Sequence, residues 1–132
     1  MTHARLVQDW LEEWHTHNLD LSMSHYADDA LFMSPAVLVA QPGANGRASG
    51  TATIRERYQR RLERSPKLRF AVEDVIDRPY GVSVIYRKLG VFAEQPGLTV
   101  EIFETSDGLM RRNVVSWGLE EVASRFAVRE QP

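Results

Sequence analysis

The segment from Leu98 to Trp117 constrains the fold of this chain most strongly. Two runs rich in β-branched and aromatic residues flank Ser106-Asp107-Gly108, and an Asp-Gly pair supplies the positive φ angles of a tight hairpin turn. Because side chains alternate across a strand, Glu101 and Phe103 are expected to share one face of the hairpin. An antiparallel sheet with this carboxylate on its inner face would form the floor of a small-molecule pocket.

Composition and charge predict one small globular domain. The 132 residues are 43% hydrophobic, which suits a single core. A formal net charge of −2 gives no electrostatic reason to expect nucleic acid or an anionic membrane as a partner. The chain has no cysteine, which excludes disulfides, thiolate zinc sites and cysteine nucleophiles and suits the reducing cytoplasm. No apolar run approaches the ~20 residues of a membrane span, and the charged first segment differs from a signal peptide, so we expect a cytoplasmic protein.

The first part of the chain predicts two helices and a short strand. A helix from about Thr2 to His17 carries one apolar stripe, formed by Leu6, Val7, Trp10, Leu11 and Trp14. Asp20 is expected to cap a second, short helix that ends at Asp28-Asp29. The residues from Ala30 to Ser34 then predict a strand, which Pro35 ends.

A segment rich in glycine and proline, from Ala36 to Gly50, predicts a long loop of the kind that often covers a binding site. Within it, Val37 to Val39 could instead extend the preceding strand. A third helix is expected from about Thr51 to Arg64, with a buried side formed by Ile54, Tyr58 and Leu62. Its arginines are expected to face solvent, because the net charge is negative and no aromatic residues interleave with them.

The remainder of the chain predicts antiparallel strands. The first strand runs from Leu68 to Ile76 and breaks its alternation near Val75-Ile76, as a β-bulge would. After a turn at Arg78 to Gly81, the next strand alternates at Val82, Val84 and Tyr86. The hairpin follows, and a final short helix is expected from Leu119 to Phe126. Helices on one side of an antiparallel sheet constitute an α+β fold.

Several motifs extend in order along nearly the whole chain. They are the tryptophan-rich first helix, His17 to Asp20, HYADDALFMSP at His25 to Pro35, the glycine loop before Ile54-Arg55, Pro66 to Phe70, Tyr86-Arg87, and EIFETSDGLMRR at Glu101 to Arg112. In this order they resemble the nuclear transport factor 2-like superfamily, and within it the SnoaL-like proteins. The resemblance implies a cone-shaped, curved antiparallel sheet around a pocket, three helices closing the wide end, and frequent dimerisation through the sheet. Members include ketosteroid isomerases, limonene epoxide hydrolases, polyketide cyclases and dehydratases.

The resemblance also implies roles for two hairpin residues. Glu101 occupies the position of a pocket-facing acidic residue in many SnoaL-like proteins, and Asn113 occupies a position where they often have a histidine. The chain departs from the family where Gly118, rather than aspartate, follows Trp117. It also has no clear match to the tyrosine and acid pair of the isomerases or to the Asp-Arg-Asp group of the epoxide hydrolases. We predict that Glu101, Asn113 and the hydroxyl of Tyr26 form the catalytic group.

A wider set of aromatic and polar residues is expected to line the pocket: Trp14, His17, Phe32, Ser34, Tyr58, Tyr86, Phe103, Val115 and Trp117. These residue types also serve in a core or at a helix end. A hairpin register shifted by one residue would turn Glu104 inward and leave Glu101 in water. His15 and His17 face different sides of a helix, so we predict neither a metal site nor a cofactor.

Two classes of function remain open from the sequence. One is a cofactor-independent isomerase, cyclase, dehydratase or hydrolase that acts on a small apolar steroid-, terpene- or polyketide-like compound. Glu101 would be its base, with donors from Tyr26, Tyr86 and Asn113. The other is a non-catalytic ligand-binding or dimerisation module of the same fold. A homodimer through the outer face of the sheet is expected from the apolar character of Val82, Val84, Val100 and Ile102.

Overall fold

The structure, a computed structural model, describes residues 3–90 and 98–117. Its elements follow in the order α1 (His3–His15), α2 (Leu19–Met23), β1 (Tyr26–Met33), α3 (Pro35–Ala40), a 3-10 turn (Pro42–Ala44), β2 (Arg47–Ser49), α4 (Thr51–Arg64), β3 (Arg69–Arg78), β4 (Gly81–Leu89), β5 (Leu98–Ser106) and β6 (Leu109–Trp117). In the described ranges, no helix is long and apolar enough to cross a membrane. The final helix predicted from Leu119 to Phe126 lies outside the described residues.

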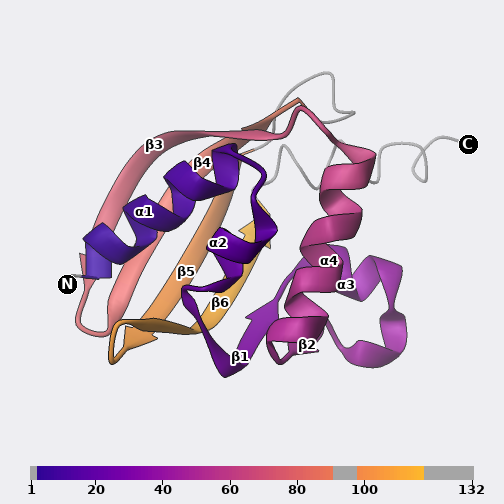
Figure 1. Ribbon diagram of the computed structural model, residues 1–132, viewed down its shortest axis with the longest axis horizontal. Coiled ribbons are helices and arrows are strands. Elements are labelled where there is room, and N and C mark those ends of the chain that lie inside the picture. The colour runs from indigo at the N-terminus through magenta and orange to yellow at the C-terminus, as the bar shows by residue number, and fades with distance from the viewer. Residues whose placement is uncertain (1–2, 91–97, 118–132) are drawn as a thin grey trace, which may run out of the picture.

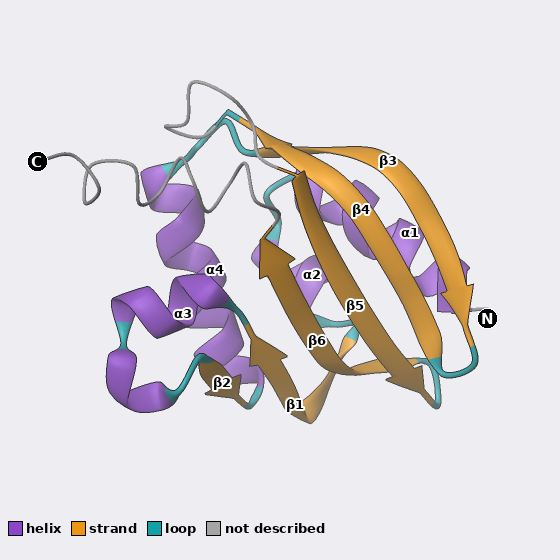
Figure 2. Ribbon diagram, turned by 180° about the vertical axis from the view of Figure 1, so that it is seen from behind, coloured by secondary structure: helices purple, strands orange, loops and turns teal. Residues whose placement is uncertain are grey.

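One six-stranded sheet, with the strand order β2-β1-β6-β5-β4-β3, curves around the helices (Figure 1). β1 and β6 pair in parallel, and the other pairs of neighbouring strands are antiparallel. α1 and α2 lie on the concave face, whereas Figure 2 shows the convex face of β3 to β6. Within residues 3–90 and 98–117 the sheet is not closed, because β2 and β3 form its two edges. The predicted α+β class and curved sheet are confirmed, and the parallel β1–β6 pair is the exception to the predicted antiparallel pairing.

The hairpin of β5 and β6 forms as the sequence predicts. Asp107 and Gly108 have φ angles of 54° and 73°, the left-handed values that a tight turn between twisted strands requires. Burial alternates along β5, so that Glu101 and Phe103 are buried and Glu104 is partly exposed. The register shifted by one residue is therefore wrong, and the carboxylate of Glu101 lies on the concave face.

The start of β1 differs from the prediction. Asn18, rather than Asp20, caps α2, and its side-chain oxygen accepts a hydrogen bond of 3.2 Å from the backbone N–H of Leu21. Asp28 and Asp29 lie within β1 instead of ending a helix. They fall where the pairing of β1 with β6 is irregular, so the strand tolerates two residues that usually mark a turn.

The segment from Ala36 to Gly50 is also more regular than a loop. The hydroxyl of Ser34 accepts a hydrogen bond of 3.1 Å from the N–H of Ala36, and Pro35 opens α3. This arrangement is a standard helix start, because proline lacks the N–H that the first helical position leaves unpaired. Val37 to Val39 are therefore helical, and their proposed strand extension is wrong. β2 then pairs with β1 and connects to α4, which has the predicted bounds.

In β3 the register of pairing with β4 shifts between Val72 and Asp74, slightly before the predicted bulge at Val75-Ile76.

The convex face of the sheet is less apolar than the sequence suggested. Val82 and Val84 are fully buried on the concave face, opposite to the side taken by Val100 and Ile102. Two of the four residues that favoured an outer interface thus belong to the core instead.

An aromatic cluster joins α1 to the concave face. The Trp10 ring lies 5.9 Å from that of Trp14, 6.2 Å from that of Phe70 and 5.1 Å from that of Phe103, measured between centroids. The predicted apolar stripe of α1 is buried in full. Trp10 is thus the central contact between the first helix and the sheet.

Replacing Trp10 by alanine should therefore destabilise the fold strongly. We expect Trp10→Ala to lower the free energy of unfolding by about 3–5 kcal/mol, the usual cost of removing a buried large aromatic side chain. Urea unfolding measures this change. Tyr80→Ala is the matched control, because this aromatic side chain is 78% exposed in the β3–β4 turn. A loss below about 1 kcal/mol for Trp10→Ala, typical of surface changes, would contradict the placement.

Candidate functional site

Glu101 lies at the centre of the concave face and is only 3% exposed. The hydroxyl of Tyr86 donates a hydrogen bond of 2.8 Å to Oε1, and Nδ2 of Asn113 donates one of 2.9 Å to Oε2. Each carboxylate oxygen therefore has one donor. A buried carboxylate needs such partners, because an unsatisfied charge in the interior is very costly.

The hydrogen bonds continue from Asn113 to two tyrosines. Nδ2 of Asn113 also donates to the hydroxyl of Tyr26 at 2.9 Å, and that hydroxyl lies 2.8 Å from the hydroxyl of Tyr58. We call Tyr26, Tyr58, Tyr86, Glu101 and Asn113 the Glu101 network. Its members come from β1, α4, β4, β5 and β6, so residues distant in sequence meet at one point.

Sheet register places these side chains together. Glu101 pairs with Val84 on one side and with Val115 on the other, while Asn113 pairs with Phe103. Asn113 is therefore diagonal to Glu101 across the β5–β6 pair, a separation that a carboxylate and an amide can bridge. The pairing of β5 with β6 therefore determines how Glu101 and Asn113 lie relative to each other.

Burial dominates the electrostatics of the network. Burial raises the pKa of Glu101 above its ordinary value of 4.5, while the hydrogen bonds from Tyr86 and Asn113 and the charges of Lys88 and Arg61 act in the opposite direction. Burial also raises the pKa values of Tyr26, Tyr58 and Tyr86. The three tyrosines are thus neutral at physiological pH.

Two hydrogen-bonding groups of the network are not used within it. Among the described residues, Oδ1 of Asn113 has no hydrogen-bond partner, although this side chain is fully buried. Tyr26 and Tyr58 carry two hydroxyl protons between them, and their mutual bond uses one. Since Tyr26 accepts from Asn113, the second proton has no acceptor in the network. The site therefore offers an acceptor and a donor near the carboxylate.

Most of the predicted lining residues surround this network. The Trp14 ring lies 4.7 Å and the Phe32 ring 5.4 Å from the ring of Tyr58. Phe103 and Val115 are the strand partners of Asn113 and Glu101. These side chains give the network apolar walls.

Two other predicted residues make structural contacts instead. Ser34 caps α3, as described above. Nε2 of His17 lies 2.9 Å from the carbonyl oxygen of Leu68, and His17 has a positive φ of 58° in the turn after α1. The hydrogen bond of Ser34 stabilises the start of α3, and that of His17 joins the turn after α1 to the segment before β3. Neither residue belongs to the Glu101 network.

Lys88 and Thr99 are two further polar residues of the concave face, and neither was among the predicted site residues. Both are buried on the concave face, and the Lys88 ammonium lies 5.7 Å from the centre of the Trp117 ring. The alternation of Val82, Val84 and Tyr86 along β4 would have placed Lys88 on the same side. Among the described residues, no group of three or more acidic, histidine or cysteine side chains has the geometry to hold a metal ion.

Comparisons with known proteins agree on one family. The model of the SnoaL-like domain family matches residues 7–113. A SnoaL-like protein of unknown function from Burkholderia thailandensis superposes with a TM-score of 0.77 at 23% identity, over 88% of this chain and 94% of that chain. A nuclear transport factor 2-like protein of unknown function from Burkholderia pseudomallei gives 0.75 at 15% identity, over 93% and 96%. TerC, co-crystallised with polyporic acid, gives 0.74 at 15% identity, over 91% and 94%. No curated protein matches the chain.

The raised pKa of Glu101 predicts a specific pH dependence of stability. The folded state holds the Glu101 proton more tightly than the unfolded state, so this contribution is complete below the unfolded pKa and is lost as pH rises through the folded pKa. We expect the free energy of unfolding of the native chain to fall across this window relative to that of Glu101→Gln. Urea unfolding at a series of pH values measures the difference.

The control is Glu104→Gln, which removes a partly exposed carboxylate from the convex side of the same strand. It should preserve the pH profile of the native chain. Parallel profiles for the native chain and Glu101→Gln would contradict the assignment of the buried proton to Glu101.

Proposed function

Because the chain belongs to the SnoaL-like domain family of the nuclear transport factor 2-like superfamily, we propose that it binds a small apolar molecule beside the Glu101 network and transforms it by proton transfer. The observation that carries this proposal is the buried carboxylate of Glu101, held by Tyr86 and Asn113. A desolvated carboxylate is a stronger base than one in water, because burial disfavours its charged form.

The proposed reaction is an isomerisation through an enolate. Glu101 takes the proton from a carbon next to a carbonyl group, and the C–H electron pair forms the enolate. The unused hydroxyl proton of the Tyr26–Tyr58 pair donates a hydrogen bond to the enolate oxygen, where negative charge develops. Protonated Glu101 then returns its proton to a different carbon, so the reaction needs no other reactant.

The surroundings of the network support an apolar, enolisable substrate. The Phe32, Phe103 and Val115 side chains offer no charge, and the aromatic rings favour a flat or alicyclic carbon skeleton. Cyclisation, dehydration or hydrolysis of a steroid-, terpene- or polyketide-like compound would use the same base and donor. TerC, which shares the fold, was crystallised with polyporic acid, a precedent for a ligand on this scaffold.

A non-catalytic binding or dimerisation module is the second candidate. The dense aromatic packing around the network favours it, because Trp14, Phe32 and Phe103 are all buried. Rings that fill the interior would leave Glu101 as a structural group without access to a substrate.

Proton exchange in D2O distinguishes the two candidates. We expect the native protein to accelerate deuterium incorporation next to the carbonyl group in members of a panel of enolisable bicyclic and steroid-like ketones, followed by proton NMR. Glu101→Gln should reduce the acceleration by roughly 10²–10⁴-fold, the usual contribution of a general base.

Tyr80→Phe, a change in an exposed turn, should retain full exchange activity. Circular dichroism should show that Glu101→Gln keeps its fold. Equal exchange by the native chain and Glu101→Gln, or exchange no faster than in buffer across the panel, would contradict the catalytic proposal and favour the binding module.

We further propose a homodimer through the convex face of the sheet. Ile85, Val100, Ile102 and Val114 all lie on this face, and each is partly exposed in the monomer. A second copy would bury this apolar surface against its own equivalent. Glu104 and Arg112, whose side chains lie 3.7 Å apart, would form part of the polar border.

Sedimentation equilibrium should therefore give twice the chain mass of 15.1 kDa at micromolar concentration. Ile102→Glu should yield the monomer, because a carboxylate at the centre of an apolar interface loses its hydration without gaining a partner. Tyr80→Glu, in the exposed turn, should remain dimeric. A native chain that sediments at 15.1 kDa would refute this assembly.

A further inference from the structure

The indole N–H of Trp10 is a buried hydrogen-bond donor without an acceptor. Trp10 is only 1% exposed, and among the described residues its Nε1 has no hydrogen-bond partner. A buried tryptophan usually finds an acceptor for this N–H, because a polar group left unpaired in the interior is costly. Packing against Phe70 and Phe103 accounts for the ring of Trp10 but not for its N–H.

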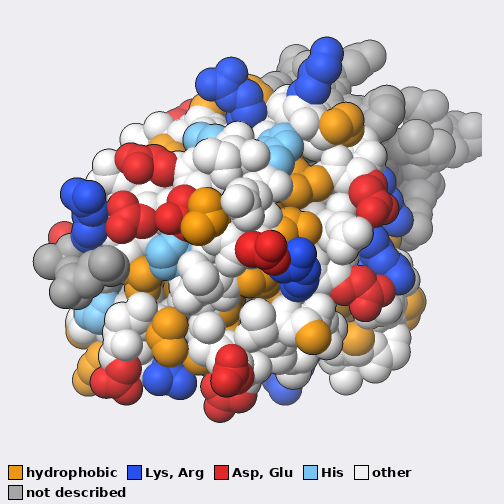
Figure 3. All heavy atoms as spheres, viewed as in Figure 1, with side chains coloured by type: hydrophobic (Ala, Val, Ile, Leu, Met, Phe, Trp, Pro, Cys, Tyr) orange, Lys and Arg blue, Asp and Glu red, His pale blue; other side chains and the backbone are white. Residues whose placement is uncertain are grey.

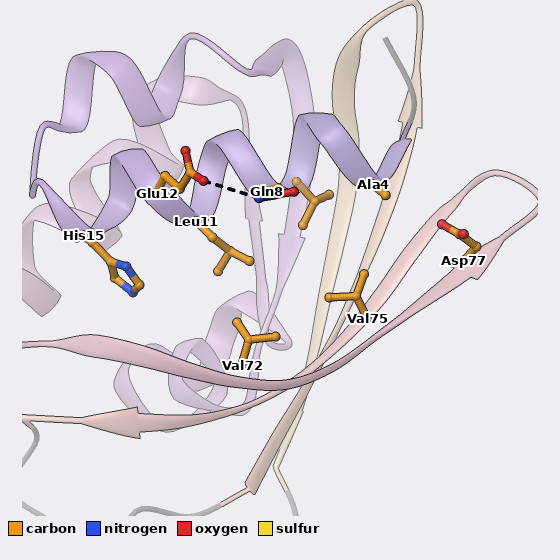
Figure 4. A pocket seen from close by; sticks show the side chains of 9 residues that line it. Ala4, Gln8, Leu11, Glu12, His15, Val72, Val75 and Asp77 are labelled. Carbon is orange, nitrogen blue, oxygen red and sulfur yellow. Dashed lines mark hydrogen bonds between the residues drawn. The ribbon is translucent and has the colours of Figure 1, made fainter.

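Neither the outer surface of α1 nor the cavity beside it supplies this acceptor. Figure 3 shows charged side chains on the surface over α1, whereas the Trp10 ring lies against Phe103 on the concave face of the sheet. A cavity of about 570 Å³ lies between α1 and β3, where Val7 and Leu11 line it from the helix (Figure 4). Trp10 is not one of its lining residues. An acceptor for the Trp10 N–H therefore has to come from the interior.

In the interior, the Trp10 N–H lies beside the hydroxyl of Tyr26. Burial and the charge of Glu101 raise the pKa of Tyr26. Donors near its oxygen lower this pKa in part, and they are Tyr58, Asn113 and Trp10. The Trp10 N–H is thus close to the Tyr26 oxygen, although the two do not form a hydrogen bond of normal length and angle.

The hydrogen bonds of the Glu101 network explain why Tyr26 does not accept from Trp10. A hydroxyl oxygen has two acceptor positions. Asn113 fills one position of Tyr26 at 2.9 Å. Tyr58, 2.8 Å away, fills the other, because burial and the bond to Tyr26 both raise the pKa of Tyr58, as expected of a donor. The proton of Tyr26 and the N–H of Trp10 are then two neighbouring donors without an acceptor.

These two donors also lie near the carboxylate of Glu101. Nδ2 of Asn113 is 2.9 Å from Oε2 of Glu101 and 2.9 Å from the hydroxyl oxygen of Tyr26. The base and the donors are therefore separated by a single amide group. An enolisable ketone carries its carbonyl group next to the carbon that loses a proton, so one substrate can contact the base and the donors together.

We propose that Trp10 is a further catalytic residue, whose indole N–H donates a hydrogen bond to the substrate oxyanion alongside the hydroxyl of Tyr26. This inference rests on the proposed proton transfer to Glu101. As Glu101 takes the proton, the C–H electron pair forms the enolate, and the two donors meet the negative charge that develops on its oxygen. Trp10 keeps its own proton throughout, because an indole N–H acts only as a hydrogen-bond donor.

The test first measures the binding of an oxyanion without turnover. Glu101→Gln reproduces the uncharged base of the enolate complex, so this variant should bind 4-nitrophenolate, a planar oxyanion, more tightly than nitrobenzene, which lacks the oxygen. Nitrogen-15 labelling of the three tryptophans gives three indole signals, which tryptophan-to-phenylalanine variants assign. Addition of 4-nitrophenolate should move the N–H proton of Trp10 downfield, as a new hydrogen bond does.

An isosteric replacement then separates the hydrogen bond from packing. Exchange of Trp10 for 3-benzothienylalanine puts sulfur in place of the N–H and keeps the shape of the ring. In the Glu101→Gln chain this change should weaken 4-nitrophenolate binding about tenfold, the usual loss of one hydrogen bond to a charged group, and should leave nitrobenzene binding unchanged. In the native chain it should slow deuterium exchange by a similar factor.

The matched control is the same replacement at Trp14. This indole is equally buried on α1, and its N–H also has no partner among the described residues, but it lies one helical turn beyond Trp10. The control should retain the affinity of the parent chain for 4-nitrophenolate. Circular dichroism checks the fold of each chain. If the replacement at Trp10 does not fold, the shift of the Trp10 signal decides.

Several outcomes would overturn the proposal. They are an equal loss of affinity for both probes on replacement of Trp10, a larger effect at Trp14, and an unshifted Trp10 signal in the chain that holds 4-nitrophenolate. Deuterium exchange by the native chain together with binding that does not depend on Trp10 would refute this inference alone. Binding that depends on Trp10 without any exchange activity would refute the proton transfer, while supporting Trp10 as a donor to a bound oxyanion.

Discussion

The burial of one carboxylate, that of Glu101, is the physical constraint around which the polar interior of this protein is arranged. Glu101 is removed from water and compensated by Tyr86 and Asn113, which donate without carrying charge. Neutral donors offset part of the desolvation cost but do not cancel it, so the pKa of Glu101 stays raised. A core built for stability alone would gain by an apolar residue here. The buried position of Glu101 in the middle of the sheet is the main physical reason for the proposed proton transfer.

The fold places hydrogen-bond donors and apolar side chains around the carboxylate of Glu101. A tight turn at Asp107-Gly108 fixes the register of two long strands, and curvature of the sheet brings β1 and α4 over the same face. Each network residue lies on a regular element, and three tyrosines reach the centre from different directions. The aromatic cluster at Trp10 closes the other side with apolar groups. Together these elements create a buried, largely apolar interior, where hydrogen bonds and charges interact more strongly than they do in water.

The sequence predicted the parts of this arrangement that depend on local periodicity. Strand alternation and a recognisable turn sufficed to place Glu101 and Asn113 on one face, and helical spacing found the buried side of α1. The sequence was less informative where tertiary pairing overrides local preference. Asp28 and Asp29 are tolerated in β1 because the pairing of β1 with β6 is irregular at these residues. Pro35 is the first residue of α3, although the apolar residues that follow it, Val37 to Val39, are also typical of a strand. The cavity lined by residues of α1 and β3 depends on the distance between a helix and an edge strand, which no local pattern encodes.

The most direct test of this account is the titration of the Glu101 carboxyl group by carbon-13 NMR, with the signal assigned through its absence in Glu101→Gln. The account predicts a midpoint above the ordinary value of 4.5, and a further increase in Tyr86→Phe, which removes a hydrogen bond that stabilises the charged form. A midpoint at or below 4.5 in the native chain, with no change in Tyr86→Phe, would show that Glu101 is an ordinary solvated carboxylate and would contradict the account.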